Sequence, residues 1–283
     1  MRITKMHGAG NDFVIVNNIE LCLPHKCFPA LARLLCAAHT GVGADGMMVV
    51  VPAERGGDYG MLFYNSDGSV GEMCGNGARC ICRYGYERGL AGNVQNVETT
   101  AGLVTGQRID ETRYRVRLND PSVIDLHRTV SVEGADCDCA YIELGDPGIP
   151  HAVVMLDDWD TWETDRLCRL GRALRFAPAF PKGANVSFVK RTGPDSVKAV
   201  TYERGVEDFT LACGTGCGSI TTALTLRGLV ERELSINMPG GLLSVSLVRE
   251  GECVHDILLT GPTCLVFDGE VSDELLEDLC RIY

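Results

Sequence analysis

The 283-residue sequence predicts an α+β protein made of two homologous halves. Short motifs of the first half return in the same order in the second half at a nearly constant offset. Cys74 returns as Cys213 (213 − 74 = 139), and Gly43-Ala44-Asp45 returns as Gly183-Ala184-Asn185 (183 − 43 = 140). Many strand-like segments accompany few helix-like ones, which argues against a doubly wound parallel sheet. The length is also typical of about two domains.

Each half places a cysteine directly before a Gly-x-Gly turn, in EMCGNGAR (residues 72–79) and LACGTGCG (residues 211–218). Helix-like runs follow at residues 78–88 and 218–227, and each run stops at a glycine, the usual C-terminal stop. We therefore expect Cys74 and Cys213 at helix N-termini. Unpaired N–H groups and the helix dipole there favour an anion, lower the pKa of a thiol and create a pocket for a carboxylate.

The first half is expected to be mostly β-structure. Strands at residues 2–7 and 12–17 flank a glycine-rich turn, and apolar spacing predicts a helix at residues 27–39. The other expected strands are bounded by turn residues; they are residues 47–51, 59–64, 94–99, 102–108 and 113–118.

The crossover to the second half is placed at Asn119-Asp120-Pro121-Ser122, because Asp-Pro breaks regular structure. A helix is expected at residues 162–175, and a tail strand (263–267) and helix (272–281, Ser272 as N-cap) close the chain. The remaining strands are residues 128–133, 139–144, 152–156, 185–190, 197–202, 233–237, 242–249 and 255–260. The expected domains are therefore 1–119 with 262–283, and 120–261.

Composition narrows the function. The net charge is −12 and no basic run is long enough for a nucleic-acid stripe, so no nucleic acid partner is expected. No stretch approaches the roughly 20 apolar residues of a membrane span, and the N-terminus lacks a signal peptide, so the expected location is the cytoplasm. The glycine-rich turn at residues 40–46 lacks the Gly-Lys-Ser/Thr of a phosphate loop.

Fourteen cysteines in a chain of this kind are expected to be reduced. Their spacing does not match a structural zinc site, so no metal is expected. Most of them, such as Cys36, Cys168 and Cys280, are interpreted as small buried side chains. Cys74 and Cys213 are interpreted as functional instead, because each precedes a Gly-x-Gly turn and the two occupy equivalent positions of the repeat.

Five motifs make the sequence similar to the diaminopimelate epimerase family over essentially its whole length. They are residues 6–13 (MHGAGNDF), 64–68 (YNSDG), 74–79 (CGNGAR), 202–205 (YERG) and 212–216 (ACGTG). The resemblance implies that each half is a sheet wrapped around one central helix, with an active site in the cleft between the halves. It further implies an isomerase that uses neither pyridoxal phosphate nor metal and interconverts LL- and meso-diaminopimelate, towards lysine and peptidoglycan. It is also compatible with a homodimer.

The chemistry suits the two thiols. Inverting an amino acid requires a base on one face of the α-carbon and an acid on the other, and one ionised and one protonated cysteine supply both. The backbone N–H groups of Gly75, Asn76, Gly214 and Thr215 would bind the substrate carboxylate and stabilise its charge. By resemblance, the substrate's amino groups and distal carboxylate are held by Asn11, Asn65, Asn185, Glu203 and Arg204. His151 either orients a catalytic group or is a structural residue.

Three departures from the family pattern bear on specificity. Ile149 replaces the asparagine of a Gly-Asn-Pro-His motif, Gly46 stands where some members have Gln, and the loop at residues 206–210 is one residue longer and contains an aromatic. None of them touches the cysteines. Two other functions therefore stay open: a racemase of another amino acid such as histidine, and a non-catalytic protein whose cysteines bind metal or sense redox state.

Overall fold

The computed structural model describes residues 1–71 and 74–282, with side chains up to residue 277, so Glu72 and Met73 of the first cysteine motif lie outside the described residues. The chain divides into two compact units, Met1–Val116 with Gly261–Tyr283, and Arg117–Thr260. Strands dominate and helices are few, which confirms the α+β prediction. The expected boundaries at 119/120 and 261/262 stay a prediction about the extent of the homologous halves.

The first unit is one mixed sheet in the order β17-β1-β2-β3-β4-β5-β6-β7. The pairs β2–β3 and β4–β5 are parallel, and the other neighbours are antiparallel. Thr263, just before β17, donates its N–H to the carbonyl of Thr112, just before β7, at 2.8 Å. The two ends of the strand order therefore meet. The strands are β1 (Arg2–Gly8), β2 (Asn11–Asn17), β3 (Gly46–Val51), β4 (Tyr59–Asn65), β5 (Val94–Thr99), β6 (Gly102–Arg108), β7 (Arg113–Arg117) and β17 (Cys264–Glu270).

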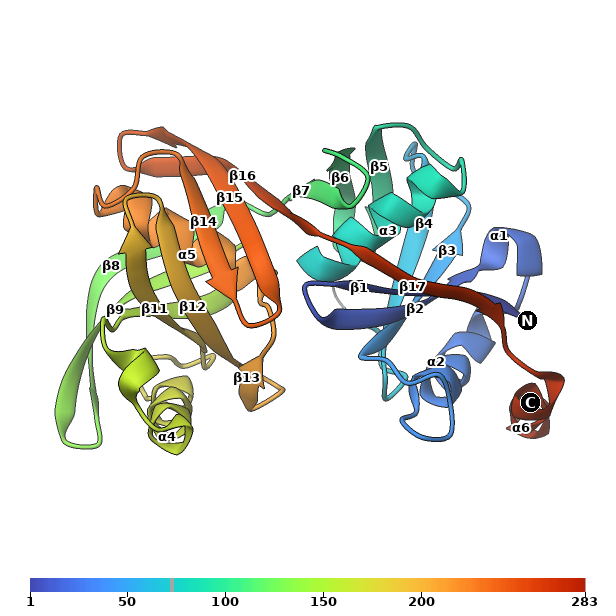
Figure 1. The fold of residues 1–283 in the computed structure, drawn as a ribbon, viewed down its shortest axis with the longest axis horizontal. Coiled ribbons are helices and arrows are strands. Elements are labelled where there is room, and N and C mark those ends of the chain that lie inside the picture. Colours follow the sequence, from blue (N-terminus) through green and yellow to red (C-terminus); the bar gives the residue numbers. More distant parts are fainter. Residues whose placement is uncertain (72–73, 283) are drawn as a thin grey trace. The chain divides into compact units, whose positions relative to one another are not determined.

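Helix α3 (Gly75–Glu87) is the central helix of the first unit and packs against this sheet (Figure 1). Ten of its thirteen residues are buried, and it packs on β1, β2 and β6. The Tyr59 hydroxyl ties the helix to the sheet, because it donates to the carbonyl of Ile81 or to Oε1 of Gln95, 2.9 and 2.8 Å away. Helix α2 (Phe28–Cys36) packs on β3 and β4 through a second apolar cluster.

The second unit repeats this plan with the order β8-β9-β10-β11-β12-β14-β15-β16. Its parallel pairs, β10–β11 and β12–β14, fall at the same two places in the order. The central helix is α5 (Gly214–Leu226), with eleven of thirteen residues buried, and α4 (Thr164–Arg175) packs on β8, β11 and β12. The strands are β8 (Pro121–Val132), β9 (Ala135–Leu144), β10 (Ile149–Met155), β11 (Asn185–Gly193), β12 (Ser196–Glu203), β13 (Asp208–Thr210), β14 (Glu233–Met238), β15 (Gly241–Glu250) and β16 (Cys253–Pro262).

The shared strand order explains the tail of the chain. In the second unit the strand beside β9 is β8, which precedes it in sequence. The corresponding place beside β1 is filled by β17, the last strand of the chain, seen in dark red along β1 in Figure 1. Helix α6 (Asp273–Ile282) follows, and the hydroxyl of Ser272 accepts the N–H of Leu275 at 3.4 Å, as expected of an N-cap.

Several predicted boundaries were wrong. The central helices begin at Gly75 and Gly214 rather than at residues 78 and 218, because the Gly-x-Gly residues form the first helical turn. Strand β8 begins at Pro121, where a strand was expected only from residue 128, since proline is tolerated at the first position of a strand. Four short elements were not predicted; they are α1 (Asn18–Leu21), η1 (His25–Cys27), η2 (Trp159–Thr161) and β13. Among the described helices, none is long and apolar enough to span a membrane.

The packing of α3 gives a stability prediction. A Cβ at Gly85 would lie 2.4 Å from the hydroxyl oxygen of Tyr59 and 2.8 Å from Oε1 of Gln95. We expect Gly85→Ala to lower the free energy of unfolding by about 1–3 kcal/mol, although alanine has the better helix propensity by about 1 kcal/mol. Urea unfolding followed by circular dichroism measures the change.

The matched control is Gly92→Ala, because nothing lies within 4 Å of a Cβ at Gly92. That variant should stay within about 0.5 kcal/mol of the parent protein. If both variants unfold at the same urea concentration, the contact between Tyr59 and α3 does not limit stability.

Candidate active site

Each unit contains one half-site, built around its own predicted cysteine at the start of the central helix. Cys74 is the N-cap of α3, with extended backbone angles (φ −108°, ψ 122°), and it is half-buried. Gly75 and Asn76 begin the helix and are buried. The strand β1 passes so close that a Cβ at Gly8 would lie 2.8 Å from the carbonyl oxygen of Asn76. Glycine at this position therefore lets β1 hold the start of the helix.

Asn11, at the start of β2, places its amide oxygen 3.3 Å from the Cys74 sulfur. Its amide nitrogen donates to Oδ2 of Asp45 at 2.5 Å, which fixes the orientation of the amide. Asp45 is held in turn, because its backbone N–H donates to Oδ1 of Asp12 at 2.9 Å. The buried Lys5 forms a 2.6 Å ion pair with Asp12 and also donates to the carbonyl of Gly43. Sequence reasoning missed these three supporting residues.

Two other predicted residues of this unit have clear local partners. Asn65, the last residue of β4, closes its own turn by donating from Nδ2 to the hydroxyl of Ser69 at 2.9 Å. Asn76 accepts a 2.8 Å hydrogen bond on Oδ1 from the guanidinium of Arg79, which is fully buried in α3. Asn65 therefore holds its own turn, and Asn76 ties the first turn of α3 to Arg79.

In the second unit Cys213 is the N-cap of α5, again with extended backbone (φ −120°, ψ 109°). It is only 4% exposed. Its sulfur lies 3.9 Å from Oε1 of Glu203, at the end of β12, and 3.7 Å from the hydroxyl of Thr215. Gly214 and Thr215 form the first turn of α5, as Gly75 and Asn76 do in α3.

The electrostatics of Cys213 correct one expectation. Burial raises its thiol pKa well above the usual 9.0, and the Glu203 carboxylate raises it further. The N–H of Gly216 and the hydroxyl of Thr215 lower the pKa, but these effects are smaller. The prediction that a helix N-terminus would lower the pKa of this thiol was therefore wrong, because desolvation outweighs the helix terminus. The structure favours the protonated form of Cys213.

His151, in β10, is completely buried beside this cysteine. Its Nε2 lies 3.0 Å from the hydroxyl of Thr215 and 3.5 Å from the amide nitrogen of Asn185. Burial lowers its pKa to about 3, and the positive charge of Arg204 contributes to the same shift. The ring is therefore neutral at pH 7, and it connects through Thr215 to the thiol of Cys213.

Asn185 and Arg204 are connected to each other and to neighbouring backbone carbonyls. Asn185, the buried first residue of β11, donates to the carbonyl of Pro150 at 3.2 Å and accepts the backbone N–H of Arg204 at 2.8 Å. Arg204 follows β12 and donates from its guanidinium to the carbonyl of Lys182 at 3.1 Å. Asn185 thus holds the chain at the residue expected to bind the distal carboxylate.

Two equivalent positions of the repeat contact each other beside the cysteine in each unit. Asn11 and His151 are 151 − 11 = 140 residues apart, as are Asp45 and Asn185 (185 − 45 = 140). Within the first unit Asn11 contacts Asp45, and within the second His151 contacts Asn185. The fold therefore repeats a contact between these positions while the side-chain chemistry has diverged.

The other cysteines are more varied than expected. Burial was correctly predicted for Cys36, and Cys80, Cys82, Cys139 and Cys217 are also buried. Cys168 is half-buried, and Cys280 lies outside the described side chains. Cys22, Cys253 and Cys264 are exposed. Within the described part of the chain, no group of three or more His, Cys, Asp or Glu side chains could hold a metal ion.

The structure explains two of the departures from the family pattern. Gly46 is required here, because a Cβ would lie 2.5 Å from the ring of Phe63. The aromatic in the longer loop, Phe209, packs edge-on against Phe188 and Tyr202, with ring centroids 6.3 and 5.8 Å apart. Ile149 is half-buried at the start of β10.

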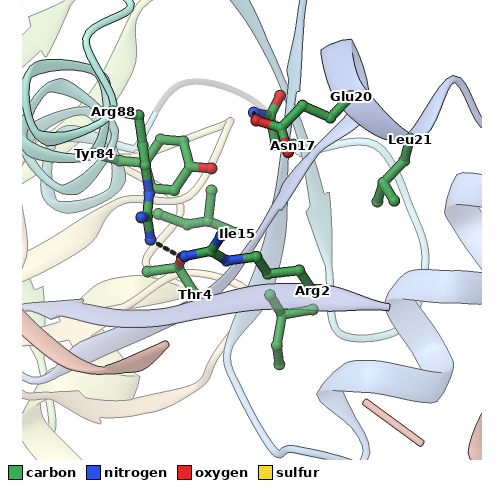
Figure 2. A pocket seen from close by; sticks show the side chains of 9 residues that line it. Arg2, Thr4, Ile15, Asn17, Glu20, Leu21, Tyr84 and Arg88 are labelled. Atoms are coloured by element: carbon green, nitrogen blue, oxygen red, sulfur yellow. Dashed lines mark hydrogen bonds between the residues drawn. The ribbon is translucent and has the colours of Figure 1, made fainter. Parts of the chain in front are cut away.

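A separate pocket in the first unit contains none of the predicted site residues (Figure 2). One of the two arginines that line it, Arg88, donates to the hydroxyl of Thr4 at 3.1 Å and forms an ion pair with Asp268. The positive charge of Arg88 is therefore already paired with a carboxylate. The pocket is lined by Arg2, Ile3, Thr4, Ile15, Asn17, Glu20, Leu21, Tyr84 and Arg88.

Solved structures with the same fold include three proteins whose names indicate different activities. A phenazine biosynthesis protein of the PhzF family from Bacillus anthracis matches with a TM-score of 0.72 and 15% identity, over 96% of this chain and 99% of that one. A probable proline racemase from Agrobacterium radiobacter K84 gives 0.69 and 17%, over 96% and 92%. A hydroxyproline epimerase from Agrobacterium vitis gives 0.66 and 19%, over 95% and 91%. At these identities the likeness establishes the fold alone.

Sequence relatives are more informative. The model of the diaminopimelate epimerase family matches residues 3–124 and 145–266. Diaminopimelate epimerases from Aquifex aeolicus and Desulfitobacterium hafniense are 39% and 36% identical, each over 98% of this chain and 100% of the relative. One from Archaeoglobus fulgidus is 35% identical over 95% and 96%. The chain therefore belongs to the diaminopimelate epimerase family and is an isomerase.

Proposed function

We propose that this protein interconverts LL- and meso-diaminopimelate by proton transfer between two cysteines and the α-carbon, without pyridoxal phosphate or metal. The observation that carries the proposal is that the same element, a cysteine N-cap on a buried central helix, occurs once in each unit of a member of this family. Its place in metabolism would be lysine and peptidoglycan precursor synthesis in the cytoplasm. A homodimer is proposed only from the family resemblance.

Two thiols are sufficient for the reaction. The α-hydrogen of an amino acid is a very weak acid, so its removal needs a positioned base and stabilisation of the resulting carbanion. A second group must return a proton to the opposite face of the carbon. The reaction thus requires Cys74 and Cys213 to reach one α-carbon from opposite faces, with one acting as base and the other as acid.

The environment of Cys213 supports a protonated resting state for this thiol. Burial and the Glu203 carboxylate favour the protonated thiol at Cys213, which suits the acid that delivers a proton. In the direction in which Cys213 delivers the proton, we assign Cys74, which is half-buried, as the base that removes the α-proton. In the reverse direction the roles exchange, because the thiol that has given up its proton becomes the base.

The first turns of α3 and α5 would bind the α-carboxylate. The N–H groups of Gly75, Asn76, Gly214 and Thr215 lie in these turns, at the positive end of each helix dipole, where an anion is stabilised. As the proton leaves, negative charge spreads into the carboxylate, and fixed donors at that point lower the barrier.

The remaining polar residues would bind the groups that do not react. Asn11 presents an amide oxygen next to Cys74, which suits an ammonium group of the substrate. Arg204 suits the distal carboxylate, because a guanidinium can bind a carboxylate through two parallel hydrogen bonds. Asn65, Asn185 and Glu203 complete the proposed set of binding residues.

The first test is loss of the α-proton signal in deuterated water, measured by NMR without added cofactor, for diaminopimelate, histidine, lysine and glutamate. Diaminopimelate should exchange fastest. Cys74→Ala and Cys213→Ala should each slow epimerisation by about 10²–10⁴-fold, the typical contribution of one general acid or base.

Cys217→Ala is the matched control, because Cys217 lies in the same helix as Cys213 but has no proposed role. It should keep nearly full turnover. Faster exchange with histidine than with diaminopimelate would replace the proposed substrate, and equal damage from all three cysteine variants would contradict the assignment of the thiols.

The second test concerns the pKa of Cys213. Since the negative charge of Glu203 raises this pKa, we expect Glu203→Gln to lower it. The pH dependence of alkylation of Cys213 by iodoacetamide, followed by peptide mass spectrometry, should then shift to lower pH. Glu252→Gln, an exposed residue of the same unit, should leave the profile in place. A shift to higher pH in Glu203→Gln would show that this carboxylate does not disfavour the thiolate.

A further inference from the structure

The loop that carries Arg204 is held in an unusual backbone conformation. It joins β12 to β13, and the N–H of Glu207 donates to the carbonyl of Glu203 at 2.8 Å, closing a tight turn. Glu207 has φ of 59°, in the left-handed region that costs a residue with a side chain about 1–2 kcal/mol. The turn therefore needs other contacts to hold its shape.

The Glu207 carboxylate supplies such contacts. Its Oε1 accepts the backbone N–H of Gly205 at 3.0 Å. The same oxygen accepts a hydrogen bond from Nε of Arg175, the last residue of α4, at 3.1 Å, and Nη2 of this guanidinium lies 3.0 Å away in an ion pair. Arg175 is 13% exposed and Glu207 31%, so this ion pair is partly withdrawn from water.

Arg175 also braces the second segment that contacts Arg204. Its carbonyl accepts the N–H of Ala184 at 3.4 Å, and its Nη1 lies so close to Gly183 that a Cβ there would be 1.9 Å away. The adjacent carbonyl of Lys182 accepts the guanidinium of Arg204 at 3.1 Å. One arginine at the end of α4 thus supports both the turn that contains Arg204 and the carbonyl that orients its side chain.

We propose that the Arg175–Glu207 ion pair is a positioning device that fixes Arg204 for binding the distal carboxylate of the substrate. This inference rests on the proposed function. Both residues act through Arg204 and are not catalytic. They would set the affinity for the substrate and leave proton transfer at the α-carbon almost unchanged, because the contact is the same in the ground and transition states.

The surrounding packing favours a local role over a global one. Beyond the turn the chain is anchored independently, because Phe209 of β13 packs on Phe188 and Tyr202 in the apolar core of the unit. Loss of the Glu207 charge should therefore loosen residues 204–207 without unfolding the unit.

The experiment begins with the activity of the parent protein on diaminopimelate. This measurement tests the proposed function separately from the positioning role of the Arg175–Glu207 ion pair. With an active parent, Glu207→Gln and Arg175→Lys should each raise KM roughly tenfold, with kcat within about twofold and the melting temperature nearly unchanged. The matched control is Asp160→Asn, which removes a similarly exposed carboxylate from its pair with Lys190 in the same unit. Its KM should equal that of the parent.

A double-mutant cycle distinguishes positioning from a general structural effect. Arg204→Lys should raise KM strongly in the parent but much less in the Glu207→Gln background, because Arg204 is already displaced there. Additive effects of the two substitutions on log KM would overturn the proposal, as would a Glu207→Gln enzyme with unchanged KM. An inactive parent enzyme would instead contradict the proposed function.

Discussion

The burial of one helix inside each sheet is the constraint on which the site depends. Each central helix is buried along most of its length, and the residue before its first turn is a cysteine in both units. Small residues make this possible. Gly8 lets β1 pass the first turn of α3, and a Cβ at Gly216 would lie only 3.2 Å from the Cys213 sulfur. The fold therefore places a thiol at the N-terminus of a buried helix twice.

The two half-sites share a framework but differ in charge. The first is supported by an exposed network of Asp45, Asp12 and the buried Lys5, which orients the amide of Asn11. The second contains a buried neutral histidine and a carboxylate beside a buried thiol. A buried thiol next to a negative charge resists ionisation, so the second half-site holds Cys213 in its protonated form. An epimerase with two cysteines needs one thiol to be protonated while the other is charged.

Much of this arrangement could be predicted from the sequence. The repeat and the short strands between turn residues predicted the fold class, and the Gly-x-Gly motifs placed both cysteines correctly at helix N-termini. The pKa of Cys213 was predicted wrongly, because desolvation depends on packing that a motif does not contain. The roles of Lys5, Asp45 and Arg175 were missed for the same reason: their partners are distant in sequence, and no local pattern marks them.

The central claim, that two distinct thiols act as acid and base, is tested most directly by the fate of the label in deuterated water. The enzyme is given LL-diaminopimelate and stopped after a small fraction has reacted. The account predicts that the meso product carries deuterium at the inverted carbon while the remaining LL substrate keeps its protium, because different groups remove and return the proton. Deuterium appearing in substrate and product at equal rates would indicate a single base and would contradict the account.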